Sequence, residues 1–266
     1  MFNPFIIKLF IIITLLLSCE HSLTDSSKKS LLSFTDVTKK AGLANFKHVS
    51  GSIGNKWFPE SMGSGCGFID YNSDGWVDIL LVGGGSWENE ADPPSPSLFL
   101  YKNNKDGTFK DVTDESGLGE IYTYGFGVCV ADYDNDDDHD FFFTTIWNNY
   151  LFRNDSGVFV NVSNSSGLGN DSLWSTTSIF FDANKDGFVD LFVGSYVDWS
   201  PANDIWCTLD GSTKNYCTPE LYNGVASQFY QNNGDGTFSN TTEAAGFLPS
   251  PGKMLGAAEL DFNNDG

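Results

Sequence analysis

Short runs of apolar residues recur along the chain, and each run is bounded by glycine, asparagine, aspartate or serine. The runs are three to five residues long and rich in β-branched and aromatic side chains, which is typical of β-strands. They come in sets of four, and the three complete sets comprise 66–69, 79–82, 98–101 and 108–112; 128–131, 141–143, 150–152 and 158–162; and 179–181, 191–193, 228–230 and 237–241. The pattern therefore predicts a repeated unit of four short strands.

An acidic loop joins the first two runs of each unit, and a turn rich in Gly, Asn and Asp joins the last two. Such short connections are typical of antiparallel hairpins. Units of roughly 50 residues with four strands are typical of β-propeller blades. The alternative is a series of independent small sandwiches, which is less favourable because so small a unit buries too little apolar surface alone. We therefore expect an all-β fold, a β-propeller of four-stranded blades.

The acidic loop has nearly the same sequence at 70–78, 132–140 and 182–190, and a fourth copy begins at Asp261. We call the three complete copies loops one, two and three. Oxygen-bearing side chains occupy positions 1, 3, 5 and 9, as a hard cation such as calcium requires, and position 7 adds a backbone carbonyl by analogy with an EF-hand. The predicted metal ligands are Asp70, Asn72, Asp74, Trp76 and Asp78; Asp132, Asp134, Asp136, Asp138 and Asp140; Asp182, Asn184, Asp186, Phe188 and Asp190; and Asp261, Asn263 and Asp265.

The residues around these ligands indicate which cation fits. An EF-hand needs a bidentate Glu at position 12, but Leu81, Phe143 and Val193 stand there, each inside a predicted strand. Magnesium is disfavoured because it prefers to keep several waters, and zinc because no His or Cys cluster accompanies the oxygens. The alternative is acidic turns solvated without an ion, although three close carboxylates repel one another unless they are neutralised. We expect one Ca²⁺ in each complete loop.

The ends of the repeat region are incomplete in this sequence. Residues 33–38 are similar to 108–113 and predict a fourth strand with no preceding three, which in a ring would complete the last blade. At the other end, the sequence stops within the fourth copy of the loop. We therefore expect a partial propeller over 33–266, with the orphan strand, about three whole blades and the start of a fourth.

Composition excludes one class of partner. The 266 residues carry a formal net charge of −21, with 14 Lys and Arg against 35 Asp and Glu. A phosphate backbone would be repelled, so we expect no nucleic-acid binding. The acidity does not indicate disorder, because the chain also contains 23 Phe, 10 Tyr and 7 Trp, in which disordered segments are poor.

The N-terminus predicts export. Lys8 precedes an apolar run at 9–17, which is followed by Ser18 and Cys19. Residues 1–18 resemble a bacterial lipoprotein signal peptide, with a lipid on Cys19 and a polar tether over 19–32. A membrane span is the first alternative, but the run is too short, and a plain secretory signal is the second. We expect a lipid-anchored protein of the bacterial cell envelope, at the outer membrane or cell surface.

Export bears on the four remaining cysteines. Cys207 and Cys217 lie in one irregular segment, where oxidising surroundings favour a local disulfide. Cys66 and Cys129 each stand just before an acidic loop. They are either two small buried thiols or a pair that faces across neighbouring sheets. A one-residue offset in a strand reverses the face on which a side chain lies, so the two could oppose each other.

The repeats resemble the FG-GAP/VCBS family, the calcium-binding propellers that include the integrin α-subunit head. The segments 34–43, 58–65 and 234–246 and the insertion with Cys207 and Cys217 are similar to the cartilage-acidic-protein type that carries ASPIC/UnbV domains. The resemblance runs from about residue 33 onward and implies about seven blades in the full protein. Loop two departs from the pattern, because Asp137 replaces glycine at position 6, where the backbone is left-handed.

The function expected is a non-enzymatic, calcium-stabilised module that binds an extracellular protein or a glycan. The long loops hold aromatic residues suited to such contacts, or to covering the core: Trp87, Tyr196, Trp199, Trp206 and Tyr216. The alternatives are a polysaccharide lyase or hydrolase and a purely structural assembly scaffold. We assign no catalytic residues, because the sequence has three His and no hydrolase, zincin or P-loop motif.

Overall fold

The computed structural model describes residues 33–51, 54–85, 87, 96–169, 172–247 and 250–263. It divides the chain into two units, Met1–Val37 and Thr38–Gly266. The predicted signal peptide, Cys19 and the tether lie outside the described residues. No helix among the described residues is long and apolar enough to cross a membrane.

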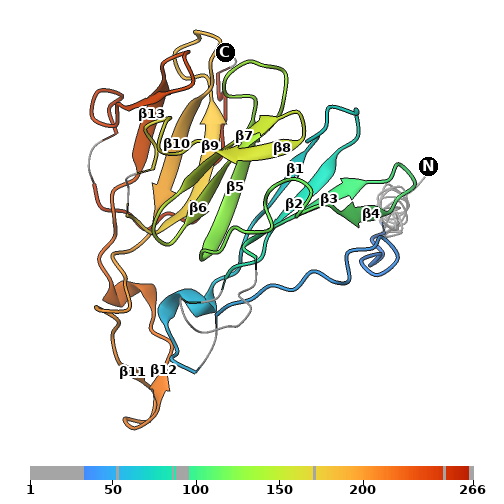
Figure 1. Cartoon of the computed structure of the whole chain (residues 1–266). Helices are drawn as coiled ribbons and strands as arrows, with labels where there is room; N and C mark the ends of the chain where they lie inside the picture. The colour runs from blue at the N-terminus through green and yellow to red at the C-terminus, as the bar shows by residue number, and fades with distance from the viewer. Residues whose placement is uncertain are drawn as a thin grey trace, which may run out of the picture. The chain divides into compact units, whose positions relative to one another are not determined.

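Three four-stranded antiparallel sheets make up most of the second unit (Figure 1). The strands of the first sheet are β1 (Cys66–Ile69), β2 (Asp78–Val82), β3 (Leu98–Asn103) and β4 (Phe109–Asp111). Those of the second are β5 (Gly125–Ala131), β6 (Asp140–Thr145), β7 (Tyr150–Asp155) and β8 (Val158–Asn161). Those of the third are β9 (Ser175–Phe181), β10 (Asp190–Ser195), β13 (Gln228–Asn232) and β14 (Phe238–Asn240). The predicted four-strand unit and the all-β class of propeller blades are confirmed.

A long insertion separates β10 from β13 and carries further regular elements. It contains the two-stranded hairpin β11 (Cys207–Thr208) and β12 (Lys214–Asn215), and the 3-10 turn η2 (Pro219–Leu221). A second 3-10 turn, η1 (Phe58–Ser61), precedes β1. The hairpin lies at the lower end of the view in Figure 1, away from the acidic loops at the upper end of the sheets.

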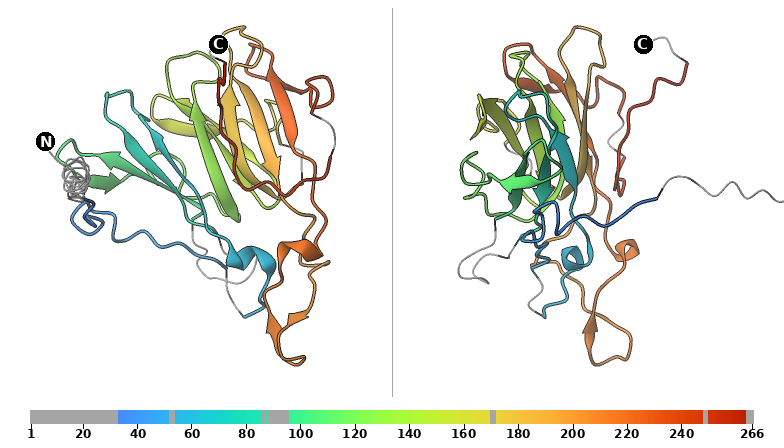
Figure 2. Two further views of the ribbon diagram at one scale, coloured as in Figure 1. Left: turned by 180° about the vertical axis from the view of Figure 1, so that it is seen from behind. Right: turned by 90° about the vertical axis from the view of Figure 1, so that its right-hand side faces the viewer.

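The first strands of the three sheets pack in the order β1, β5 and β9, with β5 in contact with both others, as the left view in Figure 2 also shows. Glycine allows this close approach. The N–H of Gly65 donates to the carbonyl of Phe126 at 2.5 Å, and a Cβ on Gly127 would lie 2.9 Å from the Thr176 carbonyl oxygen. A larger side chain at either position would push neighbouring blades apart.

The middle sheet is buried on both faces. On β6, Phe141 and Phe143 pack in the cluster shared with the first sheet, whereas Phe142 packs in the cluster shared with the third. This division follows from the two-residue period of a strand. It explains why β6 is a continuous apolar run rather than an alternating one, since both neighbouring sheets need apolar side chains from it.

The two ends of the repeat region differ from expectation. Residues 33–38 form no strand, so that prediction is wrong for the described structure. Residues 250–263 form no strand either. They nevertheless run beside the third sheet. Thr176 Oγ1 donates a hydrogen bond to the Met254 carbonyl at 2.6 Å, and the Met254 N–H donates one to the Ser195 carbonyl at 3.0 Å. The blade number of the full protein stays a prediction.

Of the four cysteines that the structure describes, two are bonded to each other and two are free. Cys207 and Cys217 form the predicted disulfide, with Cα atoms 5.3 Å apart. Cys66 and Cys129 are free thiols, so the alternative in which they pair is not realised. Gly67 faces Val128, so the adjacent Cys66 points to the other side of β1. Cys129 instead accepts a hydrogen bond from Ser178 of the third sheet, and burial raises the pKa of its thiol to about 12.

Candidate metal centres in the acidic loops

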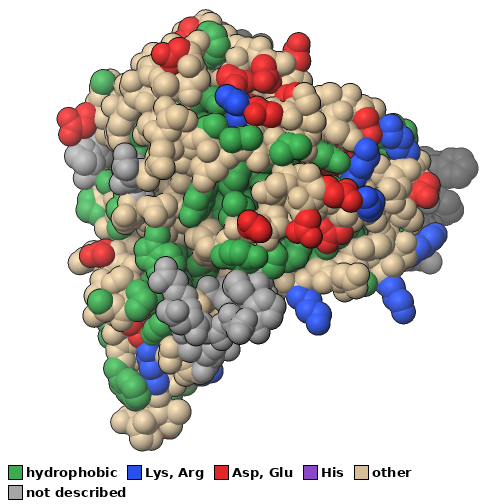
Figure 3. Space-filling view, viewed as in Figure 1, with side chains coloured by type: hydrophobic (Ala, Val, Ile, Leu, Met, Phe, Trp, Pro, Cys, Tyr) green, Lys and Arg blue, Asp and Glu red, His purple; other side chains and the backbone are tan. Residues whose placement is uncertain are grey.

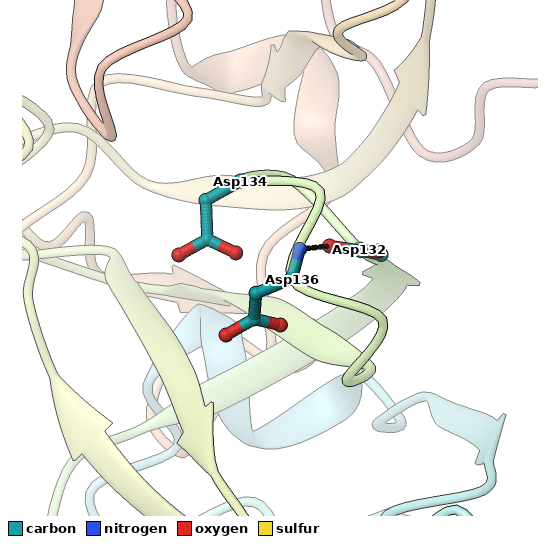
Figure 4. A group of neighbouring side chains, drawn as sticks. All are labelled: Asp132, Asp134 and Asp136. Carbon is teal, nitrogen blue, oxygen red and sulfur yellow. Dashed lines mark hydrogen bonds between the residues drawn. The ribbon is translucent and has the colours of Figure 1, made fainter.

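Loop two, between β5 and β6, gathers three carboxylates. Asp132, Asp134 and Asp136 each offer an oxygen, and these oxygens all lie within 4.8 Å of one another (Figure 4). Only this loop brings three carboxylates together among the described residues. Asp140, predicted as the fourth side-chain ligand, does not belong to this group.

Hydrogen bonds from the backbone hold the loop in this shape. Both oxygens of Asp132 accept amide protons, Oδ1 from Asp136 at 3.1 Å and Oδ2 from Asp137 at 3.0 Å. The N–H of Asp138 donates to Asp136 Oδ1 at 3.0 Å. Asp137 takes the left-handed conformation expected from its place in the pattern, with φ of 71°. A short polar side chain tolerates this backbone better than most residues do.

Loops one and three repeat the same fold. Position 1 again accepts from the amides of positions 5 and 6, at 3.0 and 2.8 Å for Asp70 and at 3.2 and 2.9 Å for Asp182. Glycine supplies the positive φ at position 6, 80° for Gly75 and 90° for Gly187. The three loops therefore share one local structure, repeated once in each sheet.

The charges around the three loops differ. In loop one, Lys105 Nζ lies 3.3 Å and Lys102 Nζ 3.8 Å from Asp74 Oδ2, so nearby ammonium groups partly neutralise that carboxylate. In loop three, the neutral Asn184 donates to Asp186 Oδ2 at 2.8 Å. Loop two therefore contains the densest group of carboxylates in the described part of the chain, and the Arg153 charge only partly offsets it at Asp134.

An unsatisfied oxygen marks the same loop. Oδ1 of Asp134 is buried and has no hydrogen-bond partner. Burial raises the pKa of Asp134, and the charges of Asp136 and Asp132 raise it further. Buried polar atoms normally have a partner. A divalent cation would supply one and would offset two of the three negative charges, so the donor set fits calcium.

Position 9 has a second role that spacing alone did not reveal. Asp78, Asp140 and Asp190 are at most 1% exposed. In loop two, Asp140 Oδ2 accepts the N–H of Tyr133 at 3.2 Å, and its Oδ1 accepts the N–H of Asn154 at 2.7 Å. These bonds tie the loop to the third strand of its own sheet. Burial raises the pKa of Asp140 to about 8, despite these two hydrogen bonds.

The remaining predicted ligands are those at position 7 of each loop and those of the fourth copy. The N–H groups of Trp76, Asp138 and Phe188 at position 7 donate to the position-5 carboxylates of their loops. The Asp138 side chain accepts from Ser73 Oγ of loop one at 3.0 Å. In the fourth copy, Asp261 and Asn263 lie in an irregular segment, and Asp265 lies outside the described residues.

Most aromatic residues of the long loops prove to be core. Trp87, Tyr196 and Trp199 are at most 5% exposed, so the interpretation that they cover the core is confirmed for them. Tyr216 is half-buried, whereas Trp206 is 64% exposed. The cluster of Trp87, Tyr196 and Trp199 also includes Phe58 of η1. Phe58 stacks on Tyr222 of the insertion, with ring centroids 5.2 Å apart, a contact that the sequence pattern did not predict.

Acidic side chains are prominent over the upper end of the sheets, where the loops lie, and apolar side chains show mainly across the middle of the view (Figure 3). The acidic end and the hairpin end differ in chemistry. One end is suited to a cation, and the other carries the exposed Trp206 and Leu209.

Comparison with known proteins agrees with the loop geometry. A 38-residue segment is 42% identical to Cartilage acidic protein 1 of Xenopus tropicalis, covering 14% of this chain and 6% of that protein. Residues 70–143 match the family described as FG-GAP-like repeat. The chain thus contains an FG-GAP-like repeat, and both loop one and loop two lie within it.

Proposed function

We propose that loops one, two and three each bind a calcium ion, and that the ions stabilise a propeller module. The buried, unpartnered Oδ1 of Asp134 beside two further carboxylates carries this proposal. Calcium accepts oxygen ligands in flexible geometry, which suits a loop of carboxylates and carbonyls. In loop two, Asp132, Asp134 and Asp136 would hold the ion, and Asp140 would fix the loop to β7.

A calcium titration of the full chain by isothermal calorimetry tests this assignment. We expect saturable binding, with affinities of about 10⁻⁴ to 10⁻³ M as in extracellular modules. Asp134→Asn should remove one site, because it deletes the charge of the buried carboxylate. Asp106→Asn in the β3–β4 turn is the matched control and should leave the stoichiometry unchanged. Absence of binding in millimolar calcium would reject the proposal.

We further propose that the module contacts an extracellular protein or glycan and has no catalytic activity of its own. Support comes from the FG-GAP-like repeat and from the exposed Trp206 beside a cavity of about 410 Å³. Aromatic side chains of this kind stack on sugars or anchor protein partners. Trp206→Ala should weaken binding to a glycan or protein array, whereas Leu255→Ala, an exposed apolar control distant in sequence, should not.

The proposed location is the bacterial cell envelope, with the chain anchored through a lipid on Cys19. The apolar run at 9–17 followed by Ser18 and Cys19 supports this. Cys19→Ala should release the exported protein from the membrane fraction. A variant that stays membrane-bound would reject the lipid anchor without affecting the calcium assignment.

A further inference from the structure

One asparagine near the end of the third strand in each sheet lies against an acidic loop. The backbone N–H of Asn103, Asn154 and Asn232 donates to Oδ1 of the position-9 aspartate of the same sheet, at 2.7, 2.7 and 2.9 Å. Asn154 is 0% and Asn232 is 3% exposed. Water therefore cannot replace their hydrogen bonds without a local opening.

Two of these asparagines also reach the preceding sheet. Nδ2 of Asn154 donates to the carbonyl of Tyr71 in loop one at 2.8 Å, as well as to His139 of its own loop at 3.1 Å. Nδ2 of Asn232 donates in the same way to Tyr133 of loop two at 2.8 Å and to Val189 at 3.1 Å. Each amide thus joins two consecutive acidic loops, through a buried bond to the tyrosine and a partly buried bond to the loop of its own sheet.

These contacts form one continuous path through the three loops. Tyr71 and Tyr133 stand at position 2, and their N–H groups donate to Oδ2 of Asp78 and Asp140, each at 3.2 Å. The path therefore runs from Asp190 through Asn232 and Tyr133 to Asp140. It continues through Asn154 and Tyr71 to Asp78. We call this path the asparagine relay.

We propose that the asparagine relay couples calcium binding between neighbouring loops, with Asn154 linking loops one and two and Asn232 linking loops two and three. This inference rests on the proposed calcium sites. An ion that orders one loop also fixes the peptide unit at position 2, to which the next sheet is bonded. The next loop then loses less conformational freedom when its own ion binds, which makes binding cooperative.

The chain contains its own control. Asn103 has the same backbone bond to Asp78, but its Nδ2 donates to Val77 of its own sheet at 2.9 Å. Replacing Asn103 should therefore disturb the local turn without interrupting a link between loops. Consecutive loops also touch at their tips. Loops one and two are joined by Ser73 Oγ to Asp138 and by the Asp70 N–H to His139 Nδ1, and loops two and three by Asn135 Nδ2 to the Gly187 carbonyl. These three bonds are exposed and exchange readily with water.

Hydrogen–deuterium exchange of the full chain during a calcium titration tests the coupling loop by loop. For each of the loops 70–78, 132–140 and 182–190, the midpoint is the calcium concentration at which protection of its amides from exchange is half complete. Asp136→Asn weakens the ion in loop two but keeps the oxygen that accepts the Asp138 N–H. We expect it to raise the midpoints of loops one and three by about five-fold or more. The charge-matched control, Asp106→Asn, should leave them in place.

Relay variants then localise the effect. In an Asn154→Ala background, Asp136→Asn should no longer shift loop one but should still shift loop three, and Asn232→Ala should give the reverse. Asn103→Ala should change neither shift. Should Asn154→Ala fail to fold, the Asp136→Asn result in the otherwise wild-type chain still decides whether calcium binding is coupled between the loops.

The outcomes separate the two proposals. If protection depends on calcium but Asp136→Asn does not change the midpoints of loops one and three, the coupling is overturned and the calcium sites are retained. An equal response to Asn154→Ala and Asn103→Ala would overturn the assignment of the link to Asn154. No calcium-dependent protection in any loop of the wild-type chain would reject the calcium sites, and the coupling with them.

Discussion

At the scale of single residues, spacing predicted the acidic positions but not which way each side chain points. The alternation of oxygen-bearing residues identified Asp132, Asp134 and Asp136, which the structure brings together. It treated Asp140 as one more ligand, whereas the structure buries it and uses both oxygens on backbone amides. The partners of Asp140 include the N–H of Asn154, a contact that no local pattern contains.

The buried Asp140 predicts a pH dependence in the calcium-free protein. Its pKa is raised to about 8 in the folded chain, so the folded state binds the proton more tightly than the unfolded state. Stability should therefore fall as pH rises from about 4 to 8. Urea unfolding in EDTA between pH 5 and 8 measures this slope, and Asp140→Asn should flatten it. An unchanged slope in Asp140→Asn would show that another group is responsible.

The left-handed backbone at Asp137 predicts a stabilising substitution. Asp137→Gly should stabilise the calcium-free protein by about 0.5–1 kcal/mol, because glycine adopts a positive φ without steric cost. Loss of one charge from a crowded acidic loop acts in the same direction. The reciprocal change in loop one, Gly75→Asp, should destabilise by a similar amount in the same urea assay. Destabilisation by Asp137→Gly would contradict this explanation.

At the scale of elements, local pattern sufficed where strands pair with near neighbours in sequence. All twelve predicted runs of the three complete units are strands in the described structure. The pattern failed for 33–38, because similarity to another strand's sequence does not by itself make a segment pair in a sheet. It also missed the contact of Phe58 with the distant insertion, since a 3-10 turn has no periodic signature.

The doubly buried β6 predicts large losses on truncation. Phe142→Ala should cost about 3–5 kcal/mol, because Phe142 is 1% exposed and packs between the second and third sheets. Val160→Ala is a suitable control on β8, where the side chain is 40% exposed, and should cost much less. Chemical denaturation with calcium present measures both. Comparable losses for the two variants would contradict the assignment of β6 as core.

At the scale of the whole molecule, three similar sheets carry three similar acidic loops at one end. Glycines at 65 and 127 let the first strands approach, and apolar clusters fill the space between consecutive sheets. Sequence predicted this repetition because each blade is built from local hairpins. The insertion and its aromatic cluster differ between units, so repetition could not predict their packing.

We proposed that bound calcium stabilises the three sheets, so the melting temperature of the full chain should depend on calcium. Binding to the native state alone should stabilise it by about 2.7 kcal/mol per site at 100-fold excess over Kd. We predict a melting temperature several degrees higher in millimolar calcium than in EDTA, with a smaller shift in Asp134→Asn. Identical melting temperatures in calcium and in EDTA would contradict the account.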